Sequence, residues 1–347
     1  MSQCLYQQPE WFDLLWDHGF PRSGDERLNW AQCAVAEAGV ALPVVRAGGA
    51  LYSLSSYYTP RFGPCGGPGL SAAPIDPQAG ARWLKRRTEV HSVRLQPFRA
   101  SDLWVSDVER ALRLAGFACW HFECGVNWLE PVSLAGGFEA YWAERPSRLR
   151  NTVQRARRKL ARRSSTSIDI VSEPGEVLSE AIEAYQAVYA DSWKGVEPCP
   201  QFMPGLMSLA AEQGALRLGL LRLDGEVVAA QVWLVHDGQA DIYKLAQRPG
   251  FDALSVGSVL LAAMMAHVMD VDRVSTVDFL MGDDAYKKDW MSVRRPLWGL
   301  VAFRWRDPRC WPALLRHVGG VCLASARQRV NWGLAAIART TTPSSAE

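Results

Sequence analysis

The segment ALRLGLLRLDGEVVAAQVWLVHDGQADIYKLAQ, residues 215–247, decides the fold of this chain. Three apolar runs, at residues 215–223, 226–236 and 239–247, are separated by Asp224-Gly225 and Asp237-Gly238. Asp-Gly between apolar runs is a strong hairpin signal, because both turn positions favour a positive φ. The segment therefore predicts three successive antiparallel strands.

A helix and a further strand are expected next. After a loop at residues 248–254, the apolar run at residues 255–269 fits a buried helix with Ser255 as a serine N-cap. A strand at residues 274–280 and the polar stretch MGDDAYKKDW, residues 281–290, follow. Main-chain N–H groups at the start of such a helix bind phosphate well, so this junction suits an anion.

Length and composition limit the class of protein. A chain of 347 residues suits two lobes of about 150 residues each. With 48% hydrophobic and 21% charged residues and a net charge of +2, it is expected to be soluble and not globally polycationic. It shows no apolar run of about 18 residues and no secretion signal, and its eight cysteines form no CxxC pair. We expect a cytoplasmic protein with reduced thiols and no membrane span.

The first half alternates helices and strands. Helices are expected at residues 9–18, 25–38, 76–88 and 101–115, and strands at 40–46, 50–56, 91–96 and 117–123. This order indicates an α/β or α+β lobe. The loop at residues 57–73 is rich in Gly and Pro and begins with Tyr57-Tyr58. It either cradles a ligand or crosses the molecule for structural reasons only.

A metal site is not expected. Cys119 and His121 would share one face of a strand, whereas Cys124 would point to the other face. No second pair of ligands lies nearby in the sequence, so these residues are interpreted as strand residues.

Residues 148–163 form a basic helix with a thin apolar seam at Leu149, Val153 and Leu160. Its cations are Arg148, Arg150, Arg155, Arg157, Arg158, Lys159, Arg162 and Arg163, and no acid interrupts them. The helix either binds a phosphate-bearing partner such as RNA, a nucleotide-linked sugar or a phospholipid surface, or connects two lobes in solvent. The absence of interleaved aromatic residues weakens a single-stranded nucleic-acid interpretation.

The second half continues with a strand at residues 167–171 and helices at 176–191 and 202–213 before the central segment. A final strand is expected at residues 296–306, a helical segment at 310–333 and a disordered tail at 340–347.

This order of elements resembles the Gcn5-related N-acetyltransferase (GNAT) superfamily, and in finer detail the FemAB-like acyltransferases. The resemblance depends on four motifs: Ser192-Trp193-Lys194, Tyr243-Lys244-Leu245-Ala246, Ser255-Val256-Gly257-Ser258, and the stretch from Asp278 to Trp290. It implies an α/β (α+β) fold of two tandem GNAT-like lobes, each a mixed, mostly antiparallel sheet flanked by helices. The expected parts are a degenerate lobe (1–140), the basic connecting helix (141–165), the acyltransferase lobe (166–306), a helical segment (307–339) and the tail (340–347).

The resemblance also implies an activity. An N-acyltransferase would move an acyl group from acetyl-CoA or a longer acyl-CoA to an amine, either a cell-envelope or exopolysaccharide precursor or a small amine, without a metal. Fem-type members that build peptidoglycan cross-bridges use aminoacyl-tRNA as the donor, so that donor stays open. A non-catalytic protein that binds RNA or another anionic partner through the basic helix is the alternative from a different class.

Site roles follow from the reaction class. Asp278 is expected to accept the amine proton or to fix the amine, Lys287 to stabilise the oxyanion or bind a phosphate, and Tyr286 to protonate the leaving thiolate. Lys287 is expected to serve turnover more than folding. Donor phosphates are expected at Ser255, Val256, Gly257 and Ser258. Trp193, Lys244 and Asp283 are the expected substrate-binding residues. Alternatively, Trp193 packs internally, and Asp283-Asp284 only cap a helix.

Overall fold

The computed structural model describes residues 4–20, 25–33, 40–66, 75–163, 165–317 and 319. Its α-helices are α1 (Pro9–His18), α2 (Pro77–Lys85), α3 (Trp104–Leu114), α4 (Gly137–Glu144), α5 (Ser147–Arg163), α6 (Glu176–Asp191), α7 (Phe202–Glu212), α8 (Val256–Asp270) and α9 (Lys287–Trp290). Its strands are β1 (Glu26–Cys33), β2 (Val40–Ala47), β3 (Ala50–Ser53), β4 (Ser92–Phe98), β5 (Ala118–Pro131), β6 (Thr166–Val171), β7 (Leu216–Leu223), β8 (Glu226–His236), β9 (Gln239–Gln247), β10 (Thr276–Met281) and β11 (Val293–Phe303).

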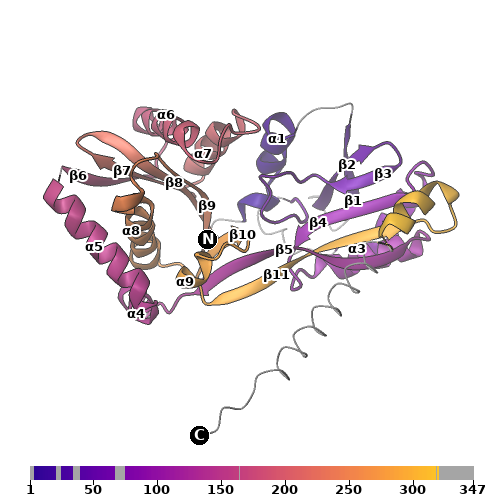
Figure 1. Ribbon diagram of the computed structural model, residues 1–347. Coiled ribbons are helices and arrows are strands. Elements are labelled where there is room, and N and C mark those ends of the chain that lie inside the picture. Colours follow the sequence, from indigo (N-terminus) through magenta and orange to yellow (C-terminus); the bar gives the residue numbers. More distant parts are fainter. Residues whose placement is uncertain are drawn as a thin grey trace, which may run out of the picture.

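These strands form one mixed sheet in the order β1-β2-β3-β4-β11-β5-β10-β9-β8-β7-β6 (Figure 1). The pairs β3–β4 and β9–β10 are parallel, and the other neighbouring pairs are antiparallel. Each parallel pair follows two antiparallel connections and is joined through a helix, α2 in the first half and α8 in the second. The predicted fold class, two tandem GNAT-like lobes, is confirmed.

The two lobes share their sheet, because β5 and β11 pair along eleven registered positions and run through both lobes. β5 is 14 residues long and also pairs with β10 of the second lobe, whereas β11 also pairs with β4 of the first. The segment proposed as the boundary, residues 141–165, therefore does not divide the sheet into two. The division of the chain into domains stays a prediction.

The predicted hairpins of the central segment are confirmed. Asp224 and Gly225 have φ values of 51° and 88°, and Asp237 and Gly238 have φ values of 50° and 70°. Positive φ at both central positions matches the right-handed twist of the flanking strands. Consequently β7, β8 and β9 pair in sequence order, with Leu223↔Glu226 and His236↔Gln239 next to the turns.

Two local predictions are wrong. The helix expected at residues 25–38 is instead β1 over Glu26–Cys33, and residues 34–38 lie outside the described residues. Pairing of β1 with β2, from Glu26↔Arg46 to Cys33↔Val40, overrides the helical propensity of this segment. Ser255 precedes α8, but it is left-handed (φ 48°) and its hydroxyl caps no N–H of the helix.

The C-terminal predictions are only partly covered. Residues 311–317 are helical, as expected for the start of the segment at 310–333, and most of the remainder lies outside the described residues. The tail at residues 340–347 lies outside them as well.

Helices cover both faces of the second lobe (Figure 1). α6 and α7 lie on one face, whereas α8, with α4 and α5, lies on the other. One apolar core continues from the first lobe to α6 and α7, where Trp11 of α1 meets Phe202 of α7 at 5.8 Å between ring centroids. This shared core holds the two lobes in one relative orientation, so side chains from both can build one site. None of the described helices combines the length and the apolar character that a bilayer span requires.

Candidate active site

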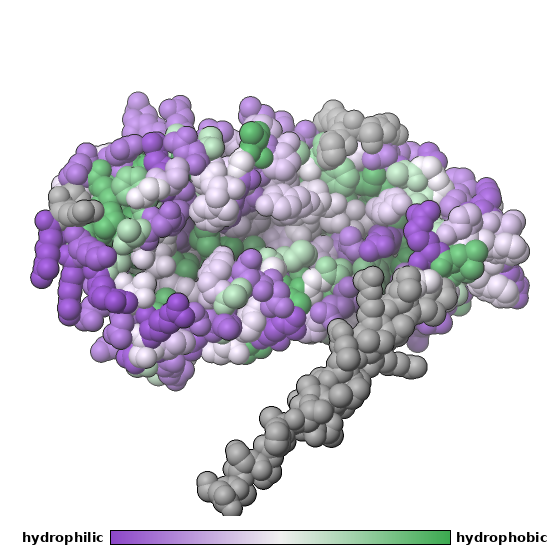
Figure 2. Space-filling model, viewed as in Figure 1, coloured by the Kyte–Doolittle hydropathy of each residue, from purple (hydrophilic) through white to green (hydrophobic). Residues whose placement is uncertain are grey.

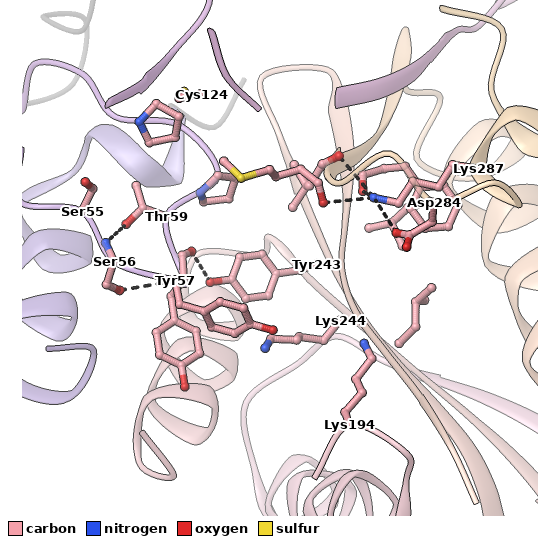
Figure 3. A pocket seen from close by; sticks show the side chains of 18 of the residues that line it. Ser55, Ser56, Tyr57, Thr59, Cys124, Lys194, Tyr243, Lys244, Asp284 and Lys287 are labelled. Atoms are coloured by element: carbon pink, nitrogen blue, oxygen red, sulfur yellow. Dashed lines mark hydrogen bonds and ion pairs between the residues drawn. The ribbon is translucent and has the colours of Figure 1, made fainter. Parts of the chain in front are cut away.

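A cavity of about 610 Å³ opens where β9 and β10 separate. The two strands pair at only three positions, Thr276↔Gln239, Val277↔Ala240 and Asp278↔Asp241. Beyond them, β9 runs on to Gln247 without β10 beside it. Main-chain groups on that edge need other hydrogen-bond partners. The space-filling view shows the surface hollowed between the two lobes (Figure 2), and the close-up shows residues of both lobes around the cavity (Figure 3).

The separation is produced by a bend at the end of β10. Leu280 is left-handed (φ 55°), and the register of β10 on β5 shifts between Asp278 and Met281. One carboxylate oxygen of Asp278, Oδ1, accepts the N–H of Leu280 at 2.8 Å. The ammonium of Lys287 donates to the carbonyls of Phe279, Leu280 and Met281 at 3.2, 3.4 and 3.1 Å (Figure 3). Left-handed backbone costs about 1–3 kcal/mol, and these contacts stabilise it.

Asp278 lies behind the cavity wall rather than on it. Its side chain is 1% exposed, and Oδ2 accepts hydrogen bonds from Arg99 at 3.1 Å and Asn127 at 3.2 Å. Burial, followed by the charge of Asp241, raises the pKa of Asp278 to about 6, although Arg99 opposes the shift. In this geometry Asp278 does not reach the cavity where an amine would bind.

Lys287 lines the cavity but is also a structural group. It is 4% exposed, and beyond the three carbonyls it forms an ion pair with Asp284 at 3.7 Å. Burial lowers the pKa of its ammonium. Because removing the ammonium would leave three carbonyls without this donor, the expectation that Lys287 hardly affects folding does not fit its contacts.

Lys244 of β9 sits in a cage of tyrosines. Its Nζ lies 4.4 Å from the ring centroid of Tyr57, 5.2 Å from Tyr58 and 5.5 Å from Tyr189. It donates to Glu197 at 3.2 Å, and the hydroxyl of Tyr58 donates to the same carboxylate oxygen at 2.6 Å. Aromatic faces attract cations, and Glu197 supplies the counter-charge. Tyr57 and Tyr58 come from the first lobe, so this cage joins the lobes at the cavity.

Tyr286 lies on the β10 side of the cavity. Its ring packs on Phe279 at 5.5 Å between centroids, and the residue is 47% exposed. Burial raises its pKa to about 12, so the hydroxyl keeps its proton at neutral pH. A protonated hydroxyl on the cavity wall suits proton donation to a leaving group.

The remaining predicted substrate residues lie at or beyond the rim. Trp193 is 71% exposed, so the interpretation that it packs internally is wrong. Asp283 is exposed and binds Arg294 at 2.7 Å and the indole N–H of Trp128 at 2.8 Å, away from the cavity. Its neighbour Asp284 lines the cavity instead. No side chain caps the start of α9 within the described residues, so the capping alternative is wrong too.

The predicted phosphate site at Ser255, Val256, Gly257 and Ser258 is not part of this cavity. The N–H of Gly257 donates to Gln247 Oε1 at 3.2 Å, and the N–H groups of Ser258 and Val259 donate to the carbonyl of Ser255 at 3.0 and 3.1 Å. A phosphate would have to compete with these bonds, and donor binding there stays a prediction.

Sequence reasoning missed several residues of the site. Residues 57–60 of the Gly/Pro-rich loop line the cavity, as the ligand-cradle interpretation requires. Lys194, Glu197 and Asp284 were not proposed as site residues, although Lys194 stands in a motif of the resemblance. Local signals existed for Tyr57-Tyr58, which open the Gly/Pro-rich loop, and for Lys194 in its motif, whereas nothing near Glu197 in the sequence marked that residue.

A buried polar network lies behind the cavity and fixes β9. The carboxylate of Asp241 accepts the hydroxyl of Tyr6 at 2.8 Å and contacts His236 Nε2 at 2.9 Å. Burial would lower the pKa of His236, but Asp241 raises it to about 10; burial would raise the pKa of Asp241, but His236 lowers it. This ion pair holds the last β9 residue that is paired with β10.

No group of His, Cys, Asp and Glu in the described ranges is arranged to hold a metal ion. His121 contacts Glu109 at 3.1 Å, and burial raises the pKa of the Cys124 thiol, which lines the cavity, to about 11.

Two GNAT-like lobes with an open gap between two parallel strands are the fold that the resemblance to acyltransferases implies. Residues 147–288 match the family described as acetyltransferase (GNAT) domain. Over these residues the chain is similar to GNAT acetyltransferases, the superfamily that its sequence motifs resemble. No curated protein matches it.

Solved structures support the fold. The C-terminal domain of a putative lysylphosphatidylglycerol synthetase from Agrobacterium fabrum is 15% identical, with a TM-score of 0.52 over 84% of this chain and 86% of that one. FemX is 11% identical, with a TM-score of 0.57 over 87% and 92%. L-PGS from Bacillus licheniformis is 11% identical, with a TM-score of 0.53 over 91% and 97%. At these identities the likeness concerns the fold alone.

Proposed function

We propose that this protein transfers an acyl group from an acyl-CoA thioester to an amine acceptor in the gap between β9 and β10. The observation that carries the proposal is the divergence of these strands after Asp278↔Asp241, with Lys244 on one wall of the resulting cavity and Tyr286 on the other. The unpaired edge of β9 can hydrogen-bond an extended ligand as a missing strand would.

The chemistry is acyl transfer. The amine nitrogen attacks the thioester carbonyl, the C–S bond breaks as the tetrahedral intermediate collapses, and the nitrogen loses a proton to solvent, from which Tyr286 regains the proton that it gives to the thiolate. Lys244 favours negative charge on the carbonyl oxygen, and one well-placed donor of this kind contributes roughly 3–4 kcal/mol. Tyr286 protonates the leaving thiolate. Asp278 and Lys287 act as positioning residues, because they hold the bend that opens the gap.

For the acceptor we propose an amine-bearing precursor of the cell envelope or of an exopolysaccharide. The motive is analogy with the structures described as FemX and as lysylphosphatidylglycerol synthetase, which share the fold.

Aminoacyl-tRNA is a second candidate donor, favoured by one observation. Seven cations of α5 have exposed side chains, and none forms an ion pair with a carboxylate among the described residues: Arg148, Arg150, Arg155, Arg157, Arg158, Lys159 and Arg162. Leu149, Val153, Ala156 and Leu160 pack the opposite side of the helix. Such a face suits a polyphosphate backbone.

Donor competition tests the proposal. Purified protein is mixed with acetyl-CoA, a long-chain acyl-CoA or aminoacyl-tRNA and a panel of amines, and acylated products are identified by mass spectrometry. We expect a product with an acyl-CoA and a kcat at least tenfold lower in Tyr286→Phe. The control Tyr52→Phe changes a half-exposed tyrosine that does not line the cavity. Transfer only from aminoacyl-tRNA would select the second donor, and no transfer with any pair would contradict both.

A further inference from the structure

Three ammonium groups but only one carboxylate belong to the residues that line the cavity. Its charged lining residues are Lys194, Lys244, Lys287 and Asp284, and Glu197 stands directly behind Lys244. Lys244 is paired with Glu197 at 3.2 Å, and Lys287 with Asp284 at 3.7 Å. This leaves Lys194, an exposed residue whose side chain lines the cavity and for which the described part of the chain offers no carboxylate or carbonyl partner.

Lys194 is held near the other two ammonium groups by the loop that joins α6 to α7. Its main-chain N–H donates to the hydroxyl of Ser192 at 3.4 Å, and its Nζ lies 5.7 Å from the ring of Trp193. In the close-up, Lys194 and Lys244 enter the cavity from different elements; Lys244 runs toward Tyr57, and no dashed line joins the two lysines (Figure 3). Like charges this near repel unless an anion lies between them.

We propose that Lys194 forms an anion subsite of this cavity, which takes a carboxylate or phosphate group of one of the two substrates. The inference deepens the proposed function, because it names the chemistry that the substrate must carry. A bound anion would supply the missing counter-charge, and an ammonium–carboxylate or ammonium–phosphate bond is the strong, charge-assisted kind.

The pKa of Lys194 makes the proposed subsite sensitive to pH. Partial desolvation inside the cavity, then the charge of Lys244, lower its pKa to about 8. Lys287 adds to this lowering, whereas Glu197 and Asp284 oppose it. An anion beside Lys194 stabilises the protonated form, so binding must raise the pKa, and affinity must fall as the pH rises through about 8.

The direct test is NMR of full-length protein labelled with ¹³C at lysine Cε. The Lys194 resonance, assigned by its loss in Lys194→Arg, is followed from pH 6 to 11 alone and with inorganic phosphate, acetate or coenzyme A. We expect at least one of these anions to raise the pKa by one unit or more, equivalent to at least tenfold tighter binding to the protonated form. The exposed Lys288, which does not line the cavity, should not respond. A Lys194 pKa unchanged by all three anions would overturn the proposal.

Variants separate an anion site from other roles of Lys194. Lys194→Met should weaken binding of the effective anion at least tenfold, whereas Lys194→Arg, which keeps the charge, should retain it. In an acyl-transfer assay, Lys194→Met should raise KM and leave kcat nearly unchanged. If Lys194→Arg abolishes kcat and leaves KM unchanged, Lys194 takes up a proton during the reaction, and the proposal of an anion subsite is wrong.

Competition identifies which substrate carries the anion. If coenzyme A displaces acetate from Lys194, the subsite belongs to the donor; if both bind together, it belongs to the acceptor. The result is also independent of the proposed function. If an anion raises the pKa of Lys194 but no acyl transfer is found, the subsite is supported and the proposed reaction is contradicted. If acyl transfer occurs and Lys194→Met leaves KM unchanged, the reaction is supported and the subsite is contradicted.

Discussion

The parallel pairs β3–β4 and β9–β10 are built alike but end differently. Each pairs at three positions: Ala50↔Ser92, Leu51↔Val93 and Tyr52↔Arg94 in the first lobe, and Thr276, Val277 and Asp278 with Gln239, Ala240 and Asp241 in the second. In the first lobe the hydroxyl of Ser53 donates to the carbonyl of Gln96 at 2.7 Å and accepts its N–H at 3.1 Å. That hydroxyl bridges the strands where β3 ends.

In the second lobe Arg99 joins Gln239 of β9 to Asp278 of β10, at 3.2 and 3.1 Å, within the paired stretch. Beyond Asp278↔Asp241 no hydrogen bond among the described residues joins the two strands, and β9 continues along an open gap. The bend of β10 is held from behind by Asp278 and from the side by Lys287. The loop that follows the closed pair then supplies Ser55, Ser56 and Tyr57 to the cavity of the open one. The two similar lobes thus form a single site. The second lobe contains the gap between its parallel strands, and the first lobe supplies part of the cavity wall.

The largest effect is expected at the cage that joins the lobes. Lys244→Met should lower the free energy of unfolding by about 3–5 kcal/mol, because it leaves the Glu197 carboxylate, 11% exposed, without its ion-pair partner. The double variant Lys244→Met/Glu197→Gln should recover most of this loss, as measured by urea unfolding. If Lys244→Met lowers the free energy of unfolding by less than 1 kcal/mol, the cage does not stabilise the contact between the lobes.

The bend of the open pair is tested by Lys287→Met. Loss of the donor to three carbonyls should cost about 2–4 kcal/mol of unfolding free energy. Once a substrate is identified, kcat/KM should fall at least a hundredfold, because the gap would lose its shape. The neighbouring, exposed Lys288→Met serves as the control and should change stability by less than about 0.5 kcal/mol. Loss of activity without loss of stability would place Lys287 in the chemistry alone.

The closed pair is tested by Ser53→Ala. Removing the bridging hydroxyl leaves both main-chain groups of Gln96 without it, which should cost about 1–3 kcal/mol. Acyl transfer should stay within twofold of the wild type, because Ser53 does not line the cavity. Ser275→Ala, which removes an exposed hydroxyl bonded to the carbonyl of Gly238, is the matched control with a smaller loss. A large loss of activity in Ser53→Ala would mean that the first lobe also holds a substrate.

The smallest effect on stability is expected at α5, which belongs to the lobe with the open gap. Changing Arg155, Arg157, Arg158 and Arg162 to Gln should alter stability by no more than about 0.5 kcal/mol per position, because all four are exposed. Affinity for a phosphate-bearing partner should nevertheless fall, with a flatter dependence on salt. Arg110→Gln, exposed on α3 of the first lobe, is the control for a single position. Unchanged binding of aminoacyl-tRNA and acyl-CoA would leave α5 as a solvated connecting helix.

Elements with local signals were predictable. The Asp-Gly turns required positive φ, and the apolar run after them was long enough for α8, so the second lobe could be outlined from its sequence. β1 could not be distinguished from a helix, because its strand state depends on pairing with β2. The same reason applies to the length of β5, whose partners β10 and β11 lie more than 140 residues further along the chain.

Of the predicted site residues, Lys244, Tyr286 and Lys287 could be placed near the gap because each belongs to a strand end or the segment next to it. Their roles could not be assigned in the same way. Whether an ammonium faces a carboxylate, three carbonyls or an empty cavity depends on side chains from distant segments, and periodicity carries no information about such neighbours.

The sequence by itself determined that this protein has hairpins leading into a helix and a parallel strand, a basic helix, and motifs that resemble those of FemAB-like acyltransferases, because those features depend on residues close together in the chain. Only the tertiary structure decided that the lobes share one sheet, that one gap is closed by Ser53, and that Lys194 is left without a counter-charge in the other. Sheet pairing and charge balance are properties of groups that meet across long loops, so they exist only once the chain has folded.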